Sequence, residues 1–339
     1  MNLQYKVREL NLVHTWTISR GSDDVKHNVF VRFEKDGVFG IGEAAPSVRY
    51  NETPESTIET IQKAEPLFEK YDPWHFVDLG YAVKNLVPEQ TAAKCALDIA
   101  VFDWITKKLQ IPLHKYFGLD KTKTPFTTFS IGIDTPEKMQ QKIREAKEYP
   151  KLKIKVGTGN DEEIIKAVRE ATDKPLCVDA NEGWKTKQEA LEKIKWLESM
   201  NVEFIEQPLP AALLAETRWL RERINIPIVA DEAVKNAANI PPLAPAYDGI
   251  NIKLMKSGGI QEALRMIGMA RSLGMKIMLG CMVESSCAIT AAAHISPLVD
   301  WADLDGNLLI SNDPFKGVTV QKGKLILPEA PGLGIEGEF

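Results

Sequence analysis

The sequence predicts an α/β barrel, a (β/α)7-8 TIM-like barrel, preceded by a separate α+β domain. Strand patterns come first and helical patterns follow over residues 1–123, as in an α+β domain. From Thr124 onward, strand and helix patterns alternate regularly, which is typical of a parallel sheet. Short apolar strands that end in a charged residue recur at intervals of roughly 25 residues, the length of one βα unit in a closed barrel.

The composition is that of a soluble globular protein. The chain has 339 residues, of which 44% are hydrophobic and 26% charged, enough for a barrel and a smaller domain. Its net charge of −5 argues against nucleic acid as a partner, because nucleic-acid-binding surfaces are basic. No apolar run reaches the roughly 20 residues that span a membrane, and the N-terminus lacks the apolar core of a signal peptide. The four cysteines show no CxxC spacing, so we predict reduced thiols and a cytoplasmic location.

The α+β domain is predicted to begin with antiparallel strands. Val29–Gly37 and Val38–Ala44 form a hairpin, with Asp36-Gly37 as its turn. Turn-forming residues predict a mobile loop near 17–26 and a second loop near 46–53. Helical patterns lie at about 54–70, 89–108 and 112–117.

The barrel domain is predicted to span 124–322, and the Gly- and Pro-rich segment 323–339 to pack back on the first domain. The eight predicted strands run over or end at Phe126–Ile133, Lys151–Gly157, Asp179, Glu206, Asp231, Lys253, Lys276–Gly280 and Trp301–Asp303. The helices between them are predicted at 136–149, 160–171, 186–199, 211–223, a short helix after Asp231, 259–273 and 285–295. Because the C-terminal ends of successive strands share one mouth of a barrel, their charged residues converge there.

Three of these strands end in carboxylates: Asp179, Glu206 and Asp231. Buried carboxylates at one barrel mouth repel one another, and a hard cation between them removes that repulsion. All-oxygen ligation suits Mg²⁺ rather than zinc, and it leaves octahedral positions for water or substrate. We therefore predict a magnesium site at these residues, with three unrelated surface acids as the alternative.

Two lysines, Lys155 and Lys253, end the second and sixth strands, which face each other across an eight-strand ring. A nearby metal cation disfavours the ammonium form, so we expect lysine pKa values lowered toward neutrality, as a general base requires. The matching reaction removes a proton from carbon next to a carboxylate, with Mg²⁺ stabilising the enediolate and the second lysine returning a proton. Lys153 is predicted to lie beside Lys155 as a charge partner for the substrate carboxylate or for the metal ligands. The alternative for Lys253 is an exposed strand-end lysine.

Five motifs occur in order along the chain: Lys-Ile-Lys-Val-Gly, Asp-Ala-Asn, Ile-Glu-Gln-Pro, Ala-Asp-Glu and Asn-Ile-Lys-Leu-Met-Lys-Ser-Gly-Gly. This set resembles the muconate-lactonising branch of the enolase superfamily, over essentially the whole chain. The resemblance includes a capping first domain and the C-terminal Pro-Gly-Leu-Gly. It implies that Asp179, Glu206 and Asp231 bind Mg²⁺, and that Lys155 and Lys253 are the acid/base pair.

The eighth strand ends in Asp303-Leu-Asp305, which resembles the signature of dipeptide epimerases, where two acids hold the α-ammonium group. A zwitterionic dipeptide would place its carboxylate on Mg²⁺ and its ammonium on these acids. A muconate, an O-succinylbenzoate precursor or an N-acylamino acid has no ammonium and would leave both aspartates unpaired. The alternative is a plain Asp305-Gly306 turn that caps the strand.

Substrate selection rests on less specific features. In related Ala-Glu epimerases, an arginine of the first capping loop pairs with the glutamate side chain, so Arg20 is a candidate for that contact or for a structural role in the loop. Tyr50 in the second loop and Glu284 after the seventh strand are further candidates for substrate contact. A helix cap at Ser285-Ser286 is the rival interpretation at the latter position.

These inferences predict a Mg²⁺-dependent dipeptide epimerase that acts on the α-carbon of the C-terminal residue of Ala-Ala-like, Ala-Xaa or other small or apolar dipeptides. Ala-Glu specificity through Arg20, and an N-acylamino acid racemase or O-succinylbenzoate synthase of the same branch, are the alternatives. A barrel that binds a ligand without catalysis is expected to lack a lysine or a metal acid, and none is missing. The predicted partner is a small-molecule dipeptide, and assembly into a homo-oligomer is left open.

Overall fold

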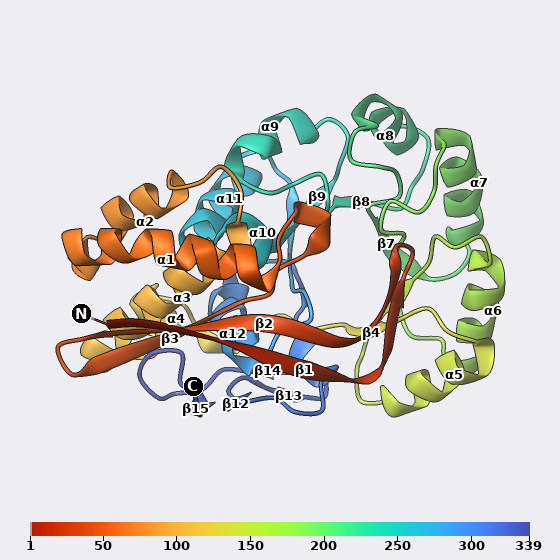
Figure 1. Ribbon diagram of the computed structural model, residues 1–339. Coiled ribbons are helices and arrows are strands. Elements are labelled where there is room, and N and C mark those ends of the chain that lie inside the picture. Colours follow the sequence, from red (N-terminus) through yellow and green to blue (C-terminus); the bar gives the residue numbers. More distant parts are fainter. Residues whose placement is uncertain (1) are drawn as a thin grey trace.

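The computed structural model describes residues 2–339, so residue 1 of the first predicted domain lies outside it (Figure 1). The capping domain opens with a three-stranded antiparallel sheet of β1 (Asn2–Ile18), β2 (Gly21–Lys35) and β3 (Val38–Ala44). The predicted turn at Asp36-Gly37 joins β2 to β3. Both residues have positive φ, 52° and 70°, as a type I′ hairpin turn requires.

The segment 17–26, predicted as a mobile loop, is instead the end of the β1–β2 hairpin. Pairing continues to the residues that flank Ser19 and Arg20, so only these two form the turn. Polar groups hold the strands together near this end, as where Thr15 Oγ1 donates to Asp24 Oδ1 over 2.7 Å. Cross-strand hydrogen bonds therefore extend the strands through residues that the sequence pattern assigns to a loop.

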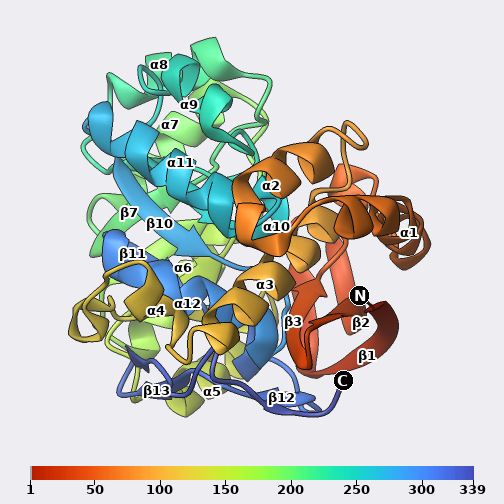
Figure 2. The same cartoon turned by 90° about the vertical axis from the view of Figure 1, so that its left-hand side faces the viewer.

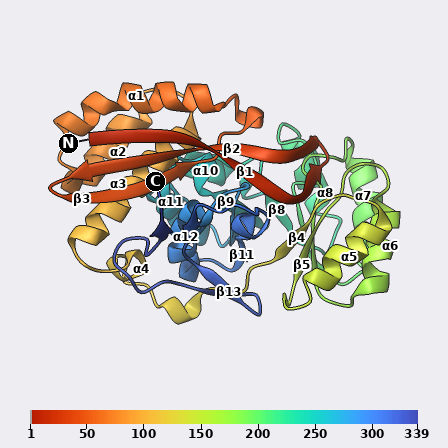
Figure 3. The same cartoon turned by 60° about the horizontal axis from the view of Figure 1, so that its bottom comes forward.

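The β1–β2 hairpin bridges the two domains. In Figures 1 and 3 its red strands run from the capping helices to the green half of the barrel. The Ile133 amide, just after the first barrel strand, donates to the Thr17 carbonyl over 3.0 Å. The end of the hairpin is thereby fixed at the barrel mouth.

The capping helices are α1 (Pro54–Lys70), α2 (Phe76–Lys84), α3 (Thr91–Lys108) and α4 (Leu113–Tyr116), with 3-10 turns at Val48–Tyr50, Pro73–His75 and Lys121–Lys123. The three predicted helices are confirmed to within two residues, but α2 was not predicted. Its Gly80 lowers helix propensity. A Cβ at Gly80 would lie 2.5 Å from Gln261 Nε2 of the barrel, so close packing between the domains selects glycine there.

Helix α3 is buried on nearly all sides, between the capping sheet and the barrel (Figure 2). Glycine allows β3 to approach it closely. A Cβ at Gly42 would lie 1.9 Å from the Ala96 carbonyl oxygen of α3. The backbones of β3 and α3 are therefore in direct contact, and α3 lies between the sheet and the barrel.

The barrel strands are parallel neighbours in ring order: β4 (Phe129–Ile131), β5 (Leu152–Lys155), β6 (Leu176–Asp179), β7 (Val202–Glu206), β8 (Ile228–Ala230), β9 (Gly249–Lys253), β10 (Lys276–Gly280) and β11 (Trp301–Asp303). The Thr128 amide, just before β4, donates to the Ala302 carbonyl of β11 over 3.0 Å. The first and last strands are therefore joined, and the predicted α/β barrel is confirmed.

The helices around the barrel are α5 (Pro136–Glu145), α6 (Asp161–Ala171), α7 (Lys187–Leu197), α8 (Leu214–Arg221), α9 (Ile240–Leu243), α10 (Leu254–Ser257), α11 (Ile260–Ser272) and α12 (Ser286–Ile295). Short 3-10 turns lie at Ala237–Asn239, Ser296–Leu298 and Gly306–Leu308. Strand β4 is shorter than the predicted 126–133, because the Ile133 amide bonds to the hairpin instead of a neighbouring strand. In the described part of the chain, no helix combines the length and apolarity that crossing a membrane requires.

Two carboxylates of the capping domain contact the N-termini of barrel helices. Glu43 of β3 accepts hydrogen bonds from the Ser285 and Ala288 amides at the start of α12, over 2.9 and 3.1 Å. Asp98 of α3 accepts from the Ile260 amide at the start of α11 over 2.6 Å. Helix N-termini carry unpaired amides and partial positive charge. Buried hydrogen bonds therefore join the two domains in addition to their shared apolar core.

The C-terminal tail lies beside the capping domain (Figure 2). It contains the short pairs β12 (Phe315–Lys316) with β15 (Glu336–Gly337), and β13 (Thr319–Gln321) with β14 (Lys324–Ile326). The Leu333 amide donates to Asp103 Oδ1 of α3 over 2.8 Å. The Leu333 carbonyl oxygen lies 3.0 Å from His294 Nε2 of α12. Both the capping domain and the barrel thus hold the tail.

Candidate active site

Three acids from successive strands meet at the barrel mouth. Asp179 ends β6, Glu206 ends β7, and Asp231 directly follows β8. All three side chains are buried, and one oxygen of each lies within 4.8 Å of the others. Parallel pairing places Asp179 beside Glu206. The structure therefore brings together the three acids that the sequence predicts at one site.

Lys155 and Lys253 contact different acids of this triad. Lys155 Nζ of β5 lies 2.6 Å from Asp179 Oδ2. Lys253 Nζ of β9 lies 2.9 Å from Asp231 Oδ2. The two ammonium groups thus flank the triad, one on each side, as expected for strands two and six of the ring.

Lys153 lies in the centre of the charged cluster. Its Nζ is 2.7 Å from Glu206 Oε2, 3.2 Å from Asp179 Oδ2 and 2.6 Å from Asp303 Oδ2. Burial alone would lower the pKa of Lys153, but these three carboxylates, Asp303 foremost, raise it well above its ordinary value. The side chain is therefore a fixed cation that links the acid triad to the end of β11.

The pKa of Lys253 differs from the expectation for a general base. Burial favours a lower pKa, but Asp231 and Glu206 overcome that effect and raise the pKa of this lysine. Burial, and then Asp179, raise the pKa of Glu206 to about 7. The acids of the triad are therefore the cause of the reversal, because their negative charge stabilises the ammonium form.

The donor set fits Mg²⁺. The triad offers three buried carboxylate oxygens in close proximity and no nitrogen or sulfur donor, the pattern that hard cations prefer. Lysine ammonium groups compensate each of these carboxylates: Lys155 for Asp179, Lys153 for Glu206, and Lys253 for Asp231. The three carboxylates thus need positive charge beside them, and a divalent cation bound between them would supply it as well.

Asp303 and Asp305 have different partners. Asp303 accepts hydrogen bonds from Lys153 Nζ and Thr128 Oγ1 over 2.6 and 2.5 Å. Burial raises its pKa, but Lys153 and Lys155 overcome this and lower the pKa of Asp303 to about 2. Among residues 2–339, the Asp305 carboxylate accepts only from Ser130, whose amide lies 2.6 Å from Oδ2. Burial and Asp303 raise the pKa of Asp305 to about 7.

Arg20, at the hairpin turn, points to the barrel and already has partners. Its Nη1 donates to Glu232 Oε1 over 2.7 Å and to the Asn181 carbonyl over 2.9 Å. Glu232 directly follows the metal-site acid Asp231, and Asn181 follows strand β6. In this structure Arg20 therefore binds the rim of the barrel mouth.

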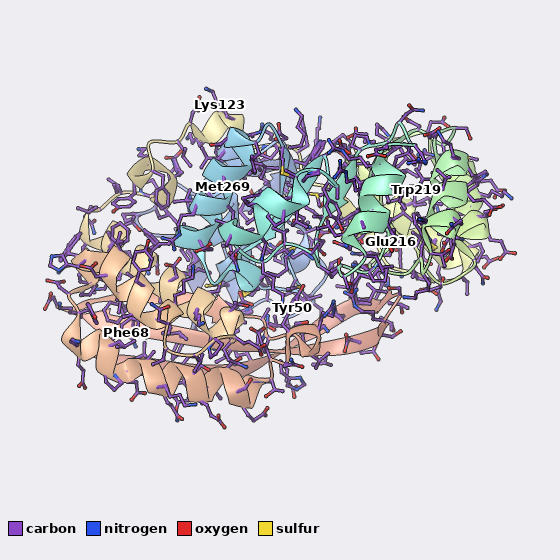
Figure 4. The ribbon with its side chains drawn as sticks, turned by 90° about the horizontal axis from the view of Figure 1, so that it is seen from above. Tyr50, Phe68, Lys123, Glu216, Trp219 and Met269 are labelled. Carbon is purple, nitrogen blue, oxygen red and sulfur yellow. The ribbon has the colours of Figure 1, made fainter. Side chains whose placement is uncertain are left out.

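Tyr50 lines the cavity at the barrel mouth, whereas Glu284 does not. Tyr50 lies between the capping sheet and the barrel (Figure 4) and lines a cavity of about 250 Å³ together with Lys155, Lys253 and Asp305. Glu284 is buried beyond that lining, and its Oε1 accepts from the Met282 amide over 2.7 Å. Burial and Glu43 raise the pKa of Glu284 to about 8. The structure thus gives Tyr50 direct access to a bound molecule and Glu284 none.

Sequence reasoning missed three residues of this site. Lys256 Nζ is buried and lies 2.5 Å from Asp231 Oδ1, in addition to its contact with the Asn251 carbonyl. Trp16 of β1 lines the cavity, and its ring centroid lies 6.0 Å from Lys155 Nζ. Glu232 is the partner of Arg20. Lys256 and Glu232 stand within two of the recognised motifs, but Trp16 lies in a strand with no special pattern.

Comparison with known proteins identifies the family. Residues 136–338 match the family model "Enolase C-terminal domain-like", and residues 4–118 match "Mandelate racemase / muconate lactonizing enzyme, N-terminal domain". The chain belongs to the enolase superfamily. The resemblance that the motifs indicate is thereby confirmed for both domains.

Relatives of this enolase-superfamily chain carry the names of dipeptide epimerases. It is 45% identical to the L-Ala-D/L-Glu epimerase of Bacteroides thetaiotaomicron, over 99% of this chain and 88% of that protein. It is 40% identical to the L-Ala-D/L-amino acid epimerase of Pedosphaera parvula, over 98% and 97% of the two chains. Among solved structures, the dipeptide epimerase from Enterococcus faecalis complexed with Mg and L-Leu-L-Tyr shares 34% identity and a TM-score of 0.92, over 98% of each chain.

Proposed function

We propose that this protein is a Mg²⁺-dependent dipeptide epimerase, which inverts the α-carbon of the C-terminal residue of a dipeptide. The observation that carries the proposal is the position of Lys155 and Lys253, which flank the buried acid triad from two sides. Proton transfer with inversion requires one acid/base group on each face of the reacting carbon. The names of the relatives, and the Mg and dipeptide in the E. faecalis complex, support this reaction.

The triad of Asp179, Glu206 and Asp231 would hold Mg²⁺, whose charge increases the acidity of the carbon next to a bound carboxylate. Lys155 removes the α-proton from one face as general base. Lys253, as an ammonium group, delivers a proton to the opposite face. The two lysines exchange roles for the other epimer, because the reaction runs in both directions through the same intermediate.

Asp305 is better placed than Asp303 to bind the ammonium group of a dipeptide. Asp303 already contacts Lys153, whereas no ion pair to Asp305 occurs among residues 2–339. Asp305 also lines the cavity that contains both catalytic lysines. A substrate ammonium would give this carboxylate the cation that it lacks and would anchor the end of the dipeptide away from the metal.

The proposed substrates are L-Ala-Xaa dipeptides with a small or apolar C-terminal residue. The cavity wall includes the apolar side chains of Trp16, Ile18 and Met282. Arg20 also reaches the cavity but is paired with Glu232. Ala-Glu is the second candidate, favoured by the name of the Bacteroides relative, and it requires Arg20 to leave Glu232 for the substrate. Because the described residues contain four free cysteines, we include a cytoplasmic location in the proposal.

Proton exchange tests the function. The enzyme with Mg²⁺ in D₂O is incubated with L-Ala-L-Ala, L-Ala-L-Leu or L-Ala-L-Glu, and the α-proton of the C-terminal residue is followed by NMR. We expect loss of that signal and appearance of the L,D epimer, with the apolar dipeptides turning over faster than L-Ala-L-Glu. Exchange of an N-acylamino acid, without exchange of any dipeptide, would reject the proposal in favour of the racemase alternative.

The variant Asp305→Asn tests the ammonium site. Loss of the carboxylate leaves the substrate ammonium unpaired, so kcat/KM for dipeptides should fall about a hundredfold. An N-acyl substrate has no ammonium and should show no comparable loss. Equal effects on both substrate classes would mean that Asp305 only maintains the fold of the site.

A further inference from the structure

Each of the two capping segments that reach the barrel mouth places one aromatic side chain in the active-site cavity. Trp16 comes from the end of β1, and Tyr50 comes from the 3-10 turn that precedes α1. Both line the same cavity of about 250 Å³ as Lys155 and Lys253. The proposed reaction gives neither ring a role toward the two lysines.

Trp16 lies on the Lys155 side of the cavity. Its ring centroid is 6.0 Å from Lys155 Nζ, within the range of a cation–π contact. The ring also lies next to the end of β4, because a Cβ at Gly132 would be 3.4 Å from Trp16 Cε3. The neighbouring Thr17 carbonyl accepts the Ile133 amide, which anchors this part of the hairpin to the end of β4.

Tyr50 lies on the Lys253 side, beside the loop after β8, which begins with Asp231, the partner of Lys253. Burial and the nearby Asp231 raise the pKa of the Tyr50 phenol. Lys235, from the loop after β8, lies 4.8 Å from the Tyr50 ring centroid. The preceding residue, Arg49, binds Glu182 through both Nε and Nη2, at 3.2 and 3.0 Å, and so fixes the turn that carries Tyr50.

We propose that each aromatic residue acts on one lysine, and so on one face of the reacting carbon. Trp16 positions Lys155 and shields it from water, and Tyr50 does the same for Lys253. Each ring excludes water from its lysine and forms the wall against which that face of the substrate rests. Both are positioning residues, because they act on the proton transfer through a lysine. The inference builds on the proposed epimerase function and assigns a separate part of the lid to each face of the reacting carbon.

The division between faces has a consequence that can be measured. Each epimer loses its α-proton to one lysine only, so isotope exchange into recovered substrate reports on one face at a time. Epimerisation rates cannot separate the two faces. The equilibrium constant fixes the ratio of the forward and reverse kcat/KM values, so a variant that slows one direction must slow the other equally. Exchange measured separately from the L,L and the L,D epimer is therefore the discriminating readout.

The test compares Trp16→Leu and Tyr50→Leu in D₂O with Mg²⁺, starting from each pure epimer of the best dipeptide. We expect each variant to slow exchange of one epimer by about five- to tenfold with little change for the other, and the affected epimers to differ between the variants. Lys155→Ala and Lys253→Ala identify the epimer that each lysine serves. Trp16→Leu must affect the same epimer as Lys155→Ala, mainly through kcat.

Controls separate this outcome from loss of structure or of lid closure. Trp16→Phe and Tyr50→Phe keep an aromatic face and should recover most of the exchange. Trp74→Leu removes a tryptophan that is 43% exposed, packs on Trp104 and does not line the cavity, so it should change neither epimer. Equal slowing of both epimers by either leucine variant would overturn the inference. Absence of exchange in the wild-type enzyme would instead reject the epimerase function.

Discussion

Lys153 joins two parts of the active site that the sequence presents separately. Its ammonium contacts Glu206 of the metal triad and Asp303 of the Asp-x-Asp motif, 2.7 and 2.6 Å away. A buried lysine with several carboxylate partners remains charged, because loss of its proton would leave those carboxylates uncompensated. Lys153 thus acts as a permanent cation, whereas the proposed reaction requires Lys155 and Lys253 to gain and lose protons.

Replacement of Asp231 should remove the metal. Asp231→Asn deletes one ligand oxygen and leaves Lys253 and Lys256 without their carboxylate partner. Mg²⁺ affinity, measured by isothermal titration calorimetry, should fall at least about a hundredfold, and proton exchange should disappear. Glu216→Gln, at a surface position on α8 (Figure 4), should leave both unchanged. Unaltered Mg²⁺ affinity in Asp231→Asn would place the metal elsewhere.

The sequence predicts the charged residues of this site well, because a barrel strand fixes where its last side chain lies. Asp179, Glu206 and Lys155 stand at strand ends, so their convergence follows from strand order alone. The hydrogen-bond partners of Arg20 cannot be predicted from strand order. Its contact with Glu232 depends on how the hairpin crosses the barrel mouth, which is a relation between domains rather than a pattern along the chain.

At the scale of elements, Glu43 caps helix α12 from another domain. Its two carboxylate oxygens accept from Asn28, from the Ser285 amide and hydroxyl, and from the Ala288 amide. In Glu43→Gln the amide NH₂ faces these donors, so buried groups lose their partners. We expect a loss of about 2–4 kcal/mol in the free energy of unfolding, measured in urea at pH 7.

A suitable comparison for that variant is Glu34→Gln on the same sheet. Glu34 pairs with Arg32 over 2.8 Å at a partly exposed position. Exposed ion pairs contribute at most about 1 kcal/mol, so this change should be small. A loss in Glu43→Gln no larger than that in Glu34→Gln would show that the cap does not stabilise the joined domains.

The second capping loop is held by the pair of Arg49 with Glu182. Glu182 has φ of +64° and follows Asn181 at +44°, so two non-glycine residues adopt the left-handed region where they meet the lid. Arg49→Lys loses the two-pronged contact that only a guanidinium makes. We expect KM for the dipeptide to rise severalfold while Mg²⁺ affinity stays unchanged, as seen by steady-state kinetics and calorimetry.

Glu182→Gln should have the same effect as Arg49→Lys, and the double variant should add little to either. Independent, additive effects of the two substitutions would contradict a direct contact. Lys166→Met, which breaks the exposed pair of Lys166 with Glu162 on α6, serves as the control and should leave KM unchanged.

Regular elements are predictable from the sequence where a local pattern and the tertiary fold agree. The alternation that begins at Thr124 gives the eight strands in their correct order, and the Asp36-Gly37 turn is correct in detail. Helix α2 escapes prediction because its Gly80 is selected by contact with Gln261 and not by helix propensity. The end of the β1–β2 hairpin escapes because its strand pairs are polar and resemble a loop in composition.

For the whole molecule, the buried pair of His114 and His294 makes stability depend on pH. His294 Nδ1 accepts from the His114 amide over 3.2 Å, which requires the neutral imidazole with its proton on Nε2. Burial lowers the pKa of His294 to about 4 from an ordinary 6.5. Between pH 6.5 and about pH 4, His294 is therefore protonated in the unfolded chain but neutral in the folded chain. The free energy of unfolding thus decreases as the pH falls through this range.

This effect amounts to about 3 kcal/mol between pH 6.5 and pH 4. Urea unfolding at several pH values measures it. His294→Gln should be less stable than the wild type at pH 7 but should lose less stability on acidification. An identical slope in both proteins would show that other groups cause the acid sensitivity.

The contact of Asp103 with Leu333 also bears on how the protein is made. Asp103 Oδ1 accepts from the Leu333 amide, which lies 230 positions later in the chain. The capping segment is synthesised long before Leu333, so the Asp103 carboxylate lacks this hydrogen bond until the tail has been made. A truncated product that stops before Leu333 therefore never forms this hydrogen bond and exposes the surface of α3 that the tail would cover.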